Sequence, residues 1–187
     1  FRAAYVAESG DSYSGMSQLI ADAMATSAPR MAVFQDLDDP PRAATYGEIM
    51  VTTFQKFGFS GLITSGAARD IEQVRRLQFP CWASSIIVSH GYCRFPDVNV
   101  DVTVGGLQVK PGDLLHADAN GIVNIPRSIA GAVAELCDPY IEAEEIILQY
   151  LRNSVPTVAG YGEAVKKSKG RMAELKQRAR SLLKATP

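Results

Sequence analysis

One segment restricts the fold more than any other part of the chain, because it joins a buried strand, a glycine turn and a helix in that order. The apolar run at 61–65 has the composition of a buried strand, and the Gly-Ala-Ala sequence at 66–68 is a tight turn. A short helix is expected over 70–77. Since a further strand candidate follows at 81–88, the order is that of a βαβ unit.

Residues 98–126 have a different pattern, in which valines alternate with other residues and tight turns separate short strands. The Lys-Pro-Gly-Asp sequence at 110–113 is one such turn, because proline fixes φ and the glycine after it accepts a positive φ. Residues 118–121 form a second turn. A β-rich meander beside βα units predicts an α/β domain with more than one sheet layer.

The chain has 187 residues, which fits one domain of ~100–200 residues with an appendage. Residues 127–152 have helical apolar spacing, which Pro139 is expected to divide into two helices. The tail at 161–187 carries eight basic residues against two acidic ones and repeats apolar residues at near-heptad spacing. We therefore predict a main domain at 1–155 and a basic amphipathic helical tail at 156–187.

The composition excludes several classes of protein. With 19 basic and 20 acidic residues the formal net charge is −1, which excludes a strongly basic nucleic-acid coat. No apolar run approaches the ~18 residues that span a bilayer, so we expect no membrane partner. Cys81, Cys93 and Cys137 form no CxxC pair, so neither a disulfide framework nor a thiolate zinc site is favoured. A reducing compartment fits best, and we expect a cytoplasmic protein.

The basic tail has two interpretations. It could contact nucleic acid, or it could be a solvated amphipathic helix whose apolar stripe docks on a neighbour. We favour docking, because a run of charges is usually the solvated face of a helix, and we therefore expect no nucleic-acid partner.

The histidines offer no clear catalytic pair. His90 and His116 lie 26 residues apart, and neither has a Glu nearby in the sequence. Because His116 lies inside an apolar strand, we expect it to be a hydrogen-bonded core residue.

Residues 66–70 are the strongest candidate for a site, because they join a buried strand to a helix N-terminus, where α/β sheets bind ligands. The planar guanidinium of Arg69 could bind a carboxylate or enolate oxygen, and Asp70, a hard oxygen ligand, could hold a divalent cation. Alternatively, Asp70 is an ordinary N-cap with Gln73 at the third helical position, and Arg69 is solvated. On these residues alone the N-cap is favoured, since caps are commoner than sites.

A second helix start, Gly47-Glu48-Ile49-Met50, supplies another carboxylate and further backbone amides without intrahelical partners. Its alternative interpretation is a helix first turn in which an acidic residue is favourable.

Five short motifs then occur in a fixed order: GEIM at 47–50, GLITSGAARD at 61–70, FPCWA at 79–83, VGGLQVKPGD at 104–113 and ADANGIV at 117–123. This series resembles the RraA-like family over about residues 1–152. The family includes the regulator of ribonuclease E activity A and the class II 4-hydroxy-4-methyl-2-oxoglutarate/4-carboxy-4-hydroxy-2-oxoadipate aldolases, which also decarboxylate oxaloacetate. Its members are often labelled demethylmenaquinone methyltransferases.

The resemblance implies a swivelling β/β/α layered domain, here with a C-terminal helical extension. It also implies a homotrimer, or a hexamer of two trimers, with sites at subunit boundaries. The family's usual N-terminal helical segment has no counterpart in the sequence, so we expect it to be absent. Two departures are Ser65, where an acidic residue is common, and Asp101, where proline is common.

The resemblance also implies roles for individual residues. Arg69 would contact the pyruvate moiety, and Asp70 would bind Mg²⁺ or Mn²⁺. Glu48 would hold a metal-bound water, while the amides of Ile49 and Met50, after Gly47, would receive the pyruvate carboxylate. A glutamate from a neighbouring subunit would complete the water shell. Three residues compete for that role: Glu142, Glu144 and Glu145.

The expected function is therefore that of a divalent-metal-dependent lyase. It would cleave 4-hydroxy-2-oxo acids by a retro-aldol reaction that releases pyruvate, or decarboxylate oxaloacetate, through a metal-stabilised pyruvate enolate. The alternative is a non-catalytic, protein-binding regulator of ribonuclease activity on the same fold. Asp70 favours the enzyme, because in the regulator the arginine of this motif is followed by a residue that is not a metal-binding carboxylate.

Overall fold

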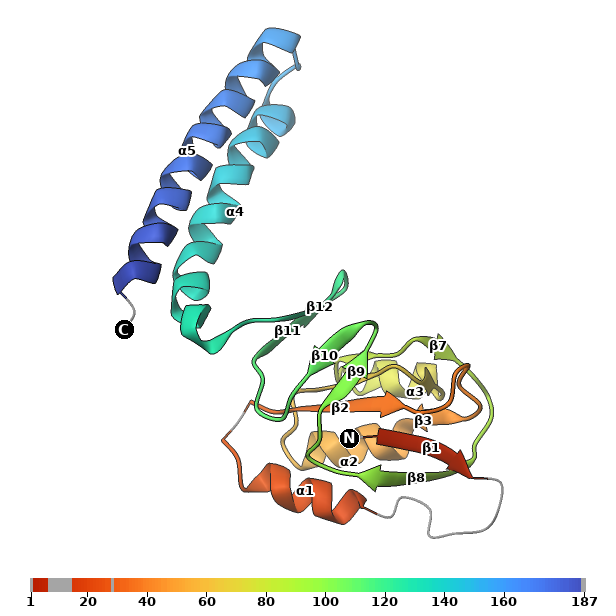
Figure 1. Cartoon of the computed structure of the whole chain (residues 1–187). Helices are drawn as coiled ribbons and strands as arrows, with labels where there is room; N and C mark the ends of the chain where they lie inside the picture. The colour runs from red at the N-terminus through yellow and green to blue at the C-terminus, as the bar shows by residue number, and fades with distance from the viewer. Residues whose placement is uncertain (1, 7–14, 28, 186–187) are drawn as a thin grey trace. The chain divides into compact units, whose positions relative to one another are not determined.

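The computed structural model describes residues 2–6, 15–27 and 29–185. The chain packs as two compact units, Phe1–Gly112 and Asp113–Pro187. Figure 1 shows the strands and short helices of the first unit and the two long helices of the second. The units are defined by packing alone, and the predicted division into 1–155 and 156–187 stays a prediction.

A five-stranded sheet forms the centre of the first unit. Its strands are β1 (Arg2–Val6), β2 (Met31–Asp36), β4 (Gly61–Thr64), β6 (Cys81–Trp82) and β8 (Tyr92–Asp97). The strand order is β6-β4-β2-β1-β8. Strand β4 pairs in parallel with β2 on one side and with β6 on the other, as the predicted βαβ order requires. Strand β8 runs antiparallel to β1 at the edge.

Two smaller sheets complete the strands of this unit. Strands β3 (Ala44–Tyr46), β5 (Ala67–Ala68) and β7 (Ser85–Ile86) form a parallel sheet in the order β3-β5-β7. Strands β9 (Val102–Val104) and β10 (Leu107–Val109) form an antiparallel hairpin. The predicted strand at 81–88 is therefore two short strands, β6 and β7, that belong to different sheets.

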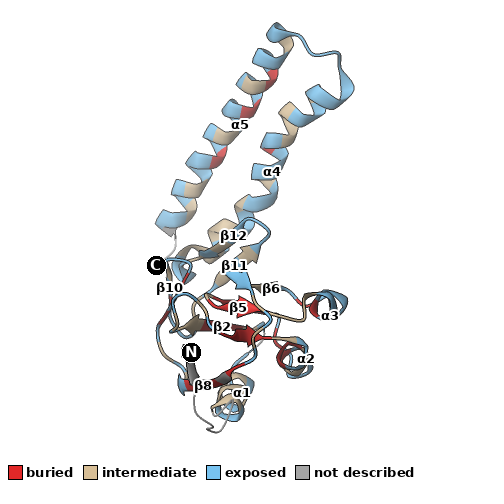
Figure 2. Cartoon of the chain, turned by 90° about the vertical axis from the view of Figure 1, so that its right-hand side faces the viewer, coloured by how far each residue is buried: buried red, intermediate tan, exposed pale blue. Residues whose placement is uncertain are grey.

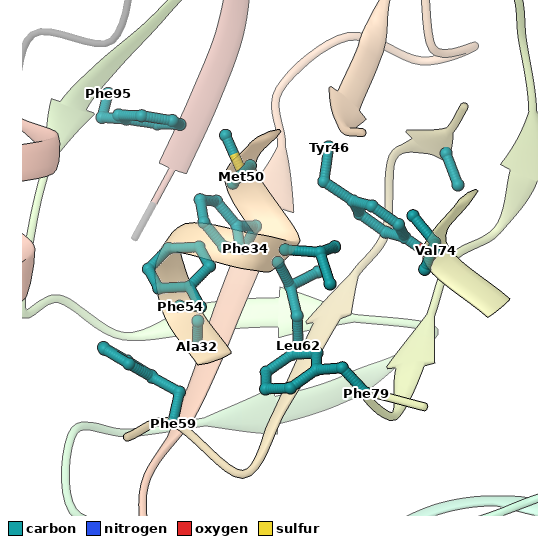
Figure 3. Close-up of a cluster of buried hydrophobic side chains, with 12 residues drawn as sticks. Ala32, Phe34, Tyr46, Met50, Phe54, Phe59, Leu62, Val74, Phe79 and Phe95 are labelled. Carbon is teal, nitrogen blue, oxygen red and sulfur yellow. The ribbon is translucent and has the colours of Figure 1, made fainter. Parts of the chain in front are cut away.

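The core of the first unit lies where helices pack on the strands (Figure 3). The helices are α1 (Met16–Met24), α2 (Glu48–Lys56) and α3 (Ile71–Arg76). Aromatic side chains dominate the cluster, and the rings of Phe54 and Phe59 have centroids 4.7 Å apart. The buried members are Ala32, Phe34, Tyr46, Met50, Val51, Phe54, Phe59, Leu62, Ala68, Val74, Phe79 and Phe95. Helix α2 contributes three of these residues, Met50, Val51 and Phe54, so its N-terminal half packs on the core.

Strand β4 is buried on both faces, since Leu62 is 0 % and its neighbour Ile63 is 1 % exposed. We expect Ile63→Val to lower the free energy of unfolding by about 1 kcal/mol, because the lost methyl group leaves a small cavity. Urea denaturation measures this change. Ile86→Val is the matched control at a 71 % exposed position, and a loss there equal to that at Ile63 would contradict the packing.

The second unit begins with a hairpin of β11 (Leu115–Asp118) and β12 (Gly121–Asn124). A 3-10 turn, η1 (Arg127–Ile129), leads into α4 (Ala130–Asn153), which is followed by α5 (Val158–Ala185). Helix α4 is continuous through Pro139, so the predicted division there is wrong. Proline removes one backbone hydrogen bond, and the packing of α4 along α5 offsets that loss.

Helix α5 packs by its apolar stripe on α4, so the docking partner of the tail is its neighbour in the same unit. Ala164, Ser168 and Leu175 of α5 are buried, as is Ala143 of α4 (Figure 2). Arg178 of α5 also donates a hydrogen bond to Glu135 of α4. Neither long helix, nor any other in the described segments, is long and apolar enough to cross a bilayer.

The expectation that His116 is a core residue is wrong. Its side chain is 63 % exposed, and Nε2 lies 4.0 Å from Oδ2 of Asp118. Strand β11 pairs with β12 in a two-stranded sheet, and its residues alternate between half-buried and exposed positions. An apolar neighbourhood in sequence therefore does not bury His116, because its side chain occupies the exposed face of the hairpin.

Candidate functional site

The two predicted helix starts meet in the structure. Oδ2 of Asp70 accepts a hydrogen bond from the backbone N–H of Glu48 at 3.0 Å. Nε of Arg69 lies 3.7 Å from the same carboxylate oxygen. The arrangement brings Glu48, the first residue of α2, beside Arg69 and Asp70, which precede α3.

The pairing of β3 with β5 explains this meeting. The strands are parallel, with Ala44 opposite Ala67 and Tyr46 opposite Ala68. The backbone N–H of Arg69 continues the pairing by donating to the carbonyl oxygen of Tyr46 at 3.1 Å. Two segments 22 residues apart in the sequence therefore leave the same sheet edge side by side.

Asp70 does not act as an ordinary side-chain N-cap. It occupies the N-cap position of α3, but its side chain makes no capping hydrogen bond there. Its backbone is left-handed, with φ 55° and ψ 39°, a conformation that L-residues adopt rarely and that concentrates at functional sites. The carboxylate is directed to the N-terminus of α2, so the N-cap interpretation does not describe this side chain.

The first turn of α2 keeps backbone donors available. The first intrahelical bond runs from the N–H of Val51 to the carbonyl of Gly47 at 3.1 Å. Asp70 takes the N–H of Glu48, whereas the N–H groups of Ile49 and Met50 have no partner among the described residues. Such donors, together with the positive end of the helix dipole, favour an anion at this point.

The side chains on either side of these donors carry opposite charges and remain partly accessible. The side chain of Arg69 is 33 % exposed and that of Asp70 is 30 % exposed. Among the described residues, the terminal guanidinium nitrogens of Arg69 have no hydrogen-bond partner. The planar fork of Arg69 is therefore available for a carboxylate or an oxo group from outside the protein.

Residue 47 must be glycine because the side chains of Arg69 and Asp70 lie against its Cα. A Cβ atom at this position would lie 2.4 Å from Oδ2 of Asp70 and 3.2 Å from Cγ of Arg69. We expect Gly47→Ala to displace the Asp70 carboxylate and lower the free energy of unfolding by about 1–3 kcal/mol. Urea denaturation tests this. Gly170→Ala is the control, because a Cβ there meets no atom within 4 Å, and an equal loss in both variants would contradict the argument.

Tyr46 and Cys81 lie close to the site but stay in their neutral forms. Burial raises the pKa of the Cys81 thiol to about 11 and raises the pKa of the Tyr46 phenol above its usual value. The two groups also share a hydrogen bond. Because a thiol is nucleophilic only as the thiolate, Cys81 is not a nucleophile at neutral pH.

The donor set fits a hard divalent cation that keeps most of its water. Within the described residues, no three His, Cys, Asp or Glu side chains form a group that could enclose a metal. Oδ1 of Asp70 nevertheless has no partner in the described part of the chain. The exposed side chain of Glu48 belongs to the residue whose N–H binds Oδ2 of the same carboxylate. Mg²⁺ is commonly bound through one or two carboxylates, with waters and substrate oxygens as the other ligands.

The three glutamates considered for a neighbouring subunit lie in the second unit, on α4. Glu142 and Glu144 are exposed, whereas Glu145 accepts a hydrogen bond from Arg152 at 2.6 Å. Their assignment to a site stays a prediction. Ser65, the departure noted in the strand, accepts the backbone N–H of Asp36 at 2.9 Å.

Comparison with known proteins identifies a family that agrees with the motif series. The model of the RraA-like family, described as Aldolase/RraA, matches residues 9–124. A protein of Halalkalibacterium halodurans named "Putative 4-hydroxy-4-methyl-2-oxoglutarate aldolase" is 28% identical over 115 residues, which are 61% of this chain and 55% of that protein. The chain thus spans about half the length of this relative.

Two solved structures share the fold. An uncharacterized protein from Pseudomonas syringae pv. tomato aligns with a TM-score of 0.63 and 19% identity, over 87% of this chain and 74% of that one. RraAS2 of Streptomyces coelicolor, described as an unusual member of the RNase ES inhibitor RraA protein family, aligns with a TM-score of 0.60 and 22% identity, over 81% and 75% of the two chains.

The predicted motif series, the layered α/β architecture with its C-terminal helices and the match over residues 9–124 agree, and the chain belongs to the RraA-like (Aldolase/RraA) family.

Proposed function

We propose that the protein is a divalent-metal-dependent lyase that releases pyruvate from 4-hydroxy-2-oxo acids by a retro-aldol reaction, decarboxylates oxaloacetate, or does both. One observation carries the proposal: Arg69 and Asp70 lie together against a helix N-terminus that has free backbone donors. The aldolase names of relatives support the same reaction class.

The substrate carboxylate would bind at the start of α2. The N–H groups of Ile49 and Met50 are free in the described structure and are ordered by the helix. Arg69 supplies a permanent positive charge next to them. Because Gly47 has no Cβ, the side chains of Arg69 and Asp70 can lie close to the start of α2. A 2-oxo acid has its carboxylate and its oxo group on adjacent carbons, so it can reach the amides and the guanidinium together.

The chemical requirement is to stabilise negative charge on the 2-oxo oxygen. In the retro-aldol reaction the C3–C4 bond breaks, the 4-hydroxyl loses its proton, and the bonding electron pair moves onto the pyruvate unit. The guanidinium of Arg69 is a fixed positive charge where this oxyanion develops. Glu48, which is exposed at the start of α2, would orient the water that accepts the hydroxyl proton.

A divalent cation would be held by Asp70, with Glu48 acting through water. When bound, Mg²⁺ or Mn²⁺ supplies Lewis-acid stabilisation to the oxo and carboxylate oxygens of the substrate. Asp70 is fit for this role because one of its oxygens is anchored by the N–H of Glu48 while the other stays open. Both cations accept oxygen ligands, so the residues do not select between them.

A substrate panel tests the proposal. The full chain is assayed for pyruvate release from oxaloacetate and from a set of 4-hydroxy-2-oxo acids, with Mg²⁺ or Mn²⁺ present. We expect Arg69→Lys to lower kcat/KM by about tenfold to a hundredfold, because an ammonium cannot reproduce the planar fork. Arg75→Lys is the matched control, since Arg75 pairs with Glu72 on the exposed face of α3.

If the wild-type protein released pyruvate from none of these compounds, this result would contradict the proposal that it is a pyruvate-releasing lyase. The remaining hypothesis would then be the non-catalytic regulator of ribonuclease activity, which binds a protein and leaves the site unused.

Assembly as a homotrimer or a hexamer, with a glutamate of α4 reaching a neighbouring site, is part of the same proposal. Analytical ultracentrifugation of the full chain tests it, and a monomer would contradict it.

A further inference from the structure

Polar side chains that the proposed reaction does not use are buried in the strands that lead to the site. Thr45 of β3 is 3 % exposed, and Thr64 of β4 is 5 % exposed. The backbone N–H of Gly66 donates to Oγ1 of Thr64 at 2.9 Å, and the two threonine hydroxyls are 3.3 Å apart. Thr45 is also hydrogen-bonded to the carboxylate of Asp36, at the end of β2. These four residues form a continuous hydrogen-bond chain.

The direction of this chain follows from its first member. A backbone N–H can only donate, so Gly66 fixes Thr64 as its acceptor. The single proton of Thr64 is then free to go to Oγ1 of Thr45, and the single proton of Thr45 goes to the carboxylate. The carboxylate is the terminal acceptor, and burial raises its pKa above the usual value.

The corner at Gly66 is packed tightly against the same groups. A Cβ atom there would lie 2.1 Å from Oγ1 of Thr45 and 2.4 Å from Oδ2 of Asp36. The carbonyl of Gly66 accepts the backbone N–H of Ser84 and its hydroxyl, each at 3.0 Å. Hydrogen bonds and van der Waals contact therefore hold this corner on several sides.

The chain of hydrogen bonds joins the two strands that carry the halves of the site. Thr45 lies in β3, two residues before Gly47, and Gly66 directly precedes β5, three residues before Arg69. The strands pair through Ala44 and Ala67. A change in the spacing between Thr45 and Gly66 would therefore move the start of α2 relative to Arg69 and Asp70.

We propose that Asp36, acting through Thr45 and Thr64, is a positioning residue that sets the distance between β3 and the Gly66 corner, so that the Asp70 carboxylate meets the N–H of Glu48. Its effect on turnover rests on the proposed function, whereas its effect on the contact between Asp70 and Glu48 does not. Asp36 lies outside the motifs that indicate the site, and the signal for it is the unusual polar Thr45 between Ala44 and Tyr46 in a buried strand.

Substitutions at Thr45 test the proposal with the full chain. Thr45→Val keeps the shape and removes the hydroxyl, whereas Thr45→Ser keeps the hydroxyl. We expect Thr45→Val to lower kcat by about tenfold to a hundredfold, because small misplacements of catalytic groups have effects of this size, and Thr45→Ser to restore most of the rate. Thr103→Val is the control, since the Thr103 side chain is exposed on β9.

A second readout does not depend on activity. In the ¹H–¹⁵N spectrum of the labelled protein, the amide resonance of Glu48 reports its hydrogen bond to Asp70. We expect this resonance to shift and its hydrogen exchange to accelerate in Thr45→Val, but not in Thr45→Ser or Thr103→Val. An unchanged Glu48 resonance in Thr45→Val would overturn the proposal, even if the rate fell.

Two further outcomes stay decisive. If Thr45→Val does not fold, Asp36→Asn replaces it, because an amide offers one acceptor oxygen where the carboxylate offers two, and Asp36 accepts from both Thr45 and the N–H of Asp38. If the wild type turns over no substrate, the proposed function fails, and the Glu48 resonance alone decides the positioning role.

Discussion

Asp70→Asn is expected to lower turnover of a 4-hydroxy-2-oxo acid by about a hundredfold or more while the fold is retained. The amide keeps the size of the side chain and an oxygen that can accept the N–H of Glu48. Asparagine also tolerates the left-handed backbone of this position, where φ is 55°. What the substitution removes is the negative charge that would hold the cation, and charge stabilisation of this kind is commonly worth a factor of 10²–10³.

The measurement is kcat/KM for pyruvate release by the wild type and the variant, with circular dichroism to verify the fold. Glu72→Gln is the matched control, because it removes an exposed carboxylate from the first turn of α3, two residues after Asp70. A variant Asp70→Asn that keeps the wild-type rate would exclude this carboxylate from the reaction.

Removal of divalent cations is expected to stop the reaction altogether. With EDTA in excess, pyruvate release should fall to the background rate, and Mg²⁺ or Mn²⁺ in excess of the chelator should restore it. The reason is that Arg69 is the one cationic side chain that the described structure places beside Asp70. Without the divalent cation, Arg69 alone would stabilise the negative charge that develops on the substrate. Full turnover in chelator would contradict metal dependence.

Thermal unfolding separates metal binding from chemistry. A ligand that binds the folded state raises its stability, by about 2.7 kcal/mol when its concentration is 100 times Kd. We therefore expect added Mn²⁺ to raise the Tm of the wild type and of Glu72→Gln, but not that of Asp70→Asn. An equal rise in all three proteins would show that the cation binds away from Asp70.

The order of the elements could be predicted from local patterns. The apolar run at 61–65 corresponds to β4, and the helix before Leu77 corresponds to α3. The predicted tight turn at 66–68 is wrong beyond Gly66, because Ala67 and Ala68 form β5 and pair with β3 and β7. Periodicity served well for the strand and the helix because the pattern is strong over a short distance. It failed at 81–88, where one apolar stretch is divided between two sheets, and at Pro139, where the contact with α5 keeps α4 continuous.

Some burial could not be predicted from neighbours in the sequence. His116 has apolar neighbours yet is exposed, because β11 has a single partner strand and one free face. The apolar stripe of the tail correctly indicated a docked helix. That its partner is α4 follows only from the contacts between the two helices in the structure. Both outcomes depend on contacts between segments that local patterns do not describe.

By itself, the sequence determined that Gly47, Glu48, Arg69 and Asp70 stand at the starts of two helices, where backbone donors are free. From those positions alone, Asp70 was better described as the cap of its own helix. Only the tertiary structure decided between the two interpretations: parallel pairing of β3 with β5 and a left-handed backbone at Asp70 turn its carboxylate to the N–H of Glu48. The physical reason is that pairing across 22 residues is a property of the assembled sheet, whereas capping signals are local.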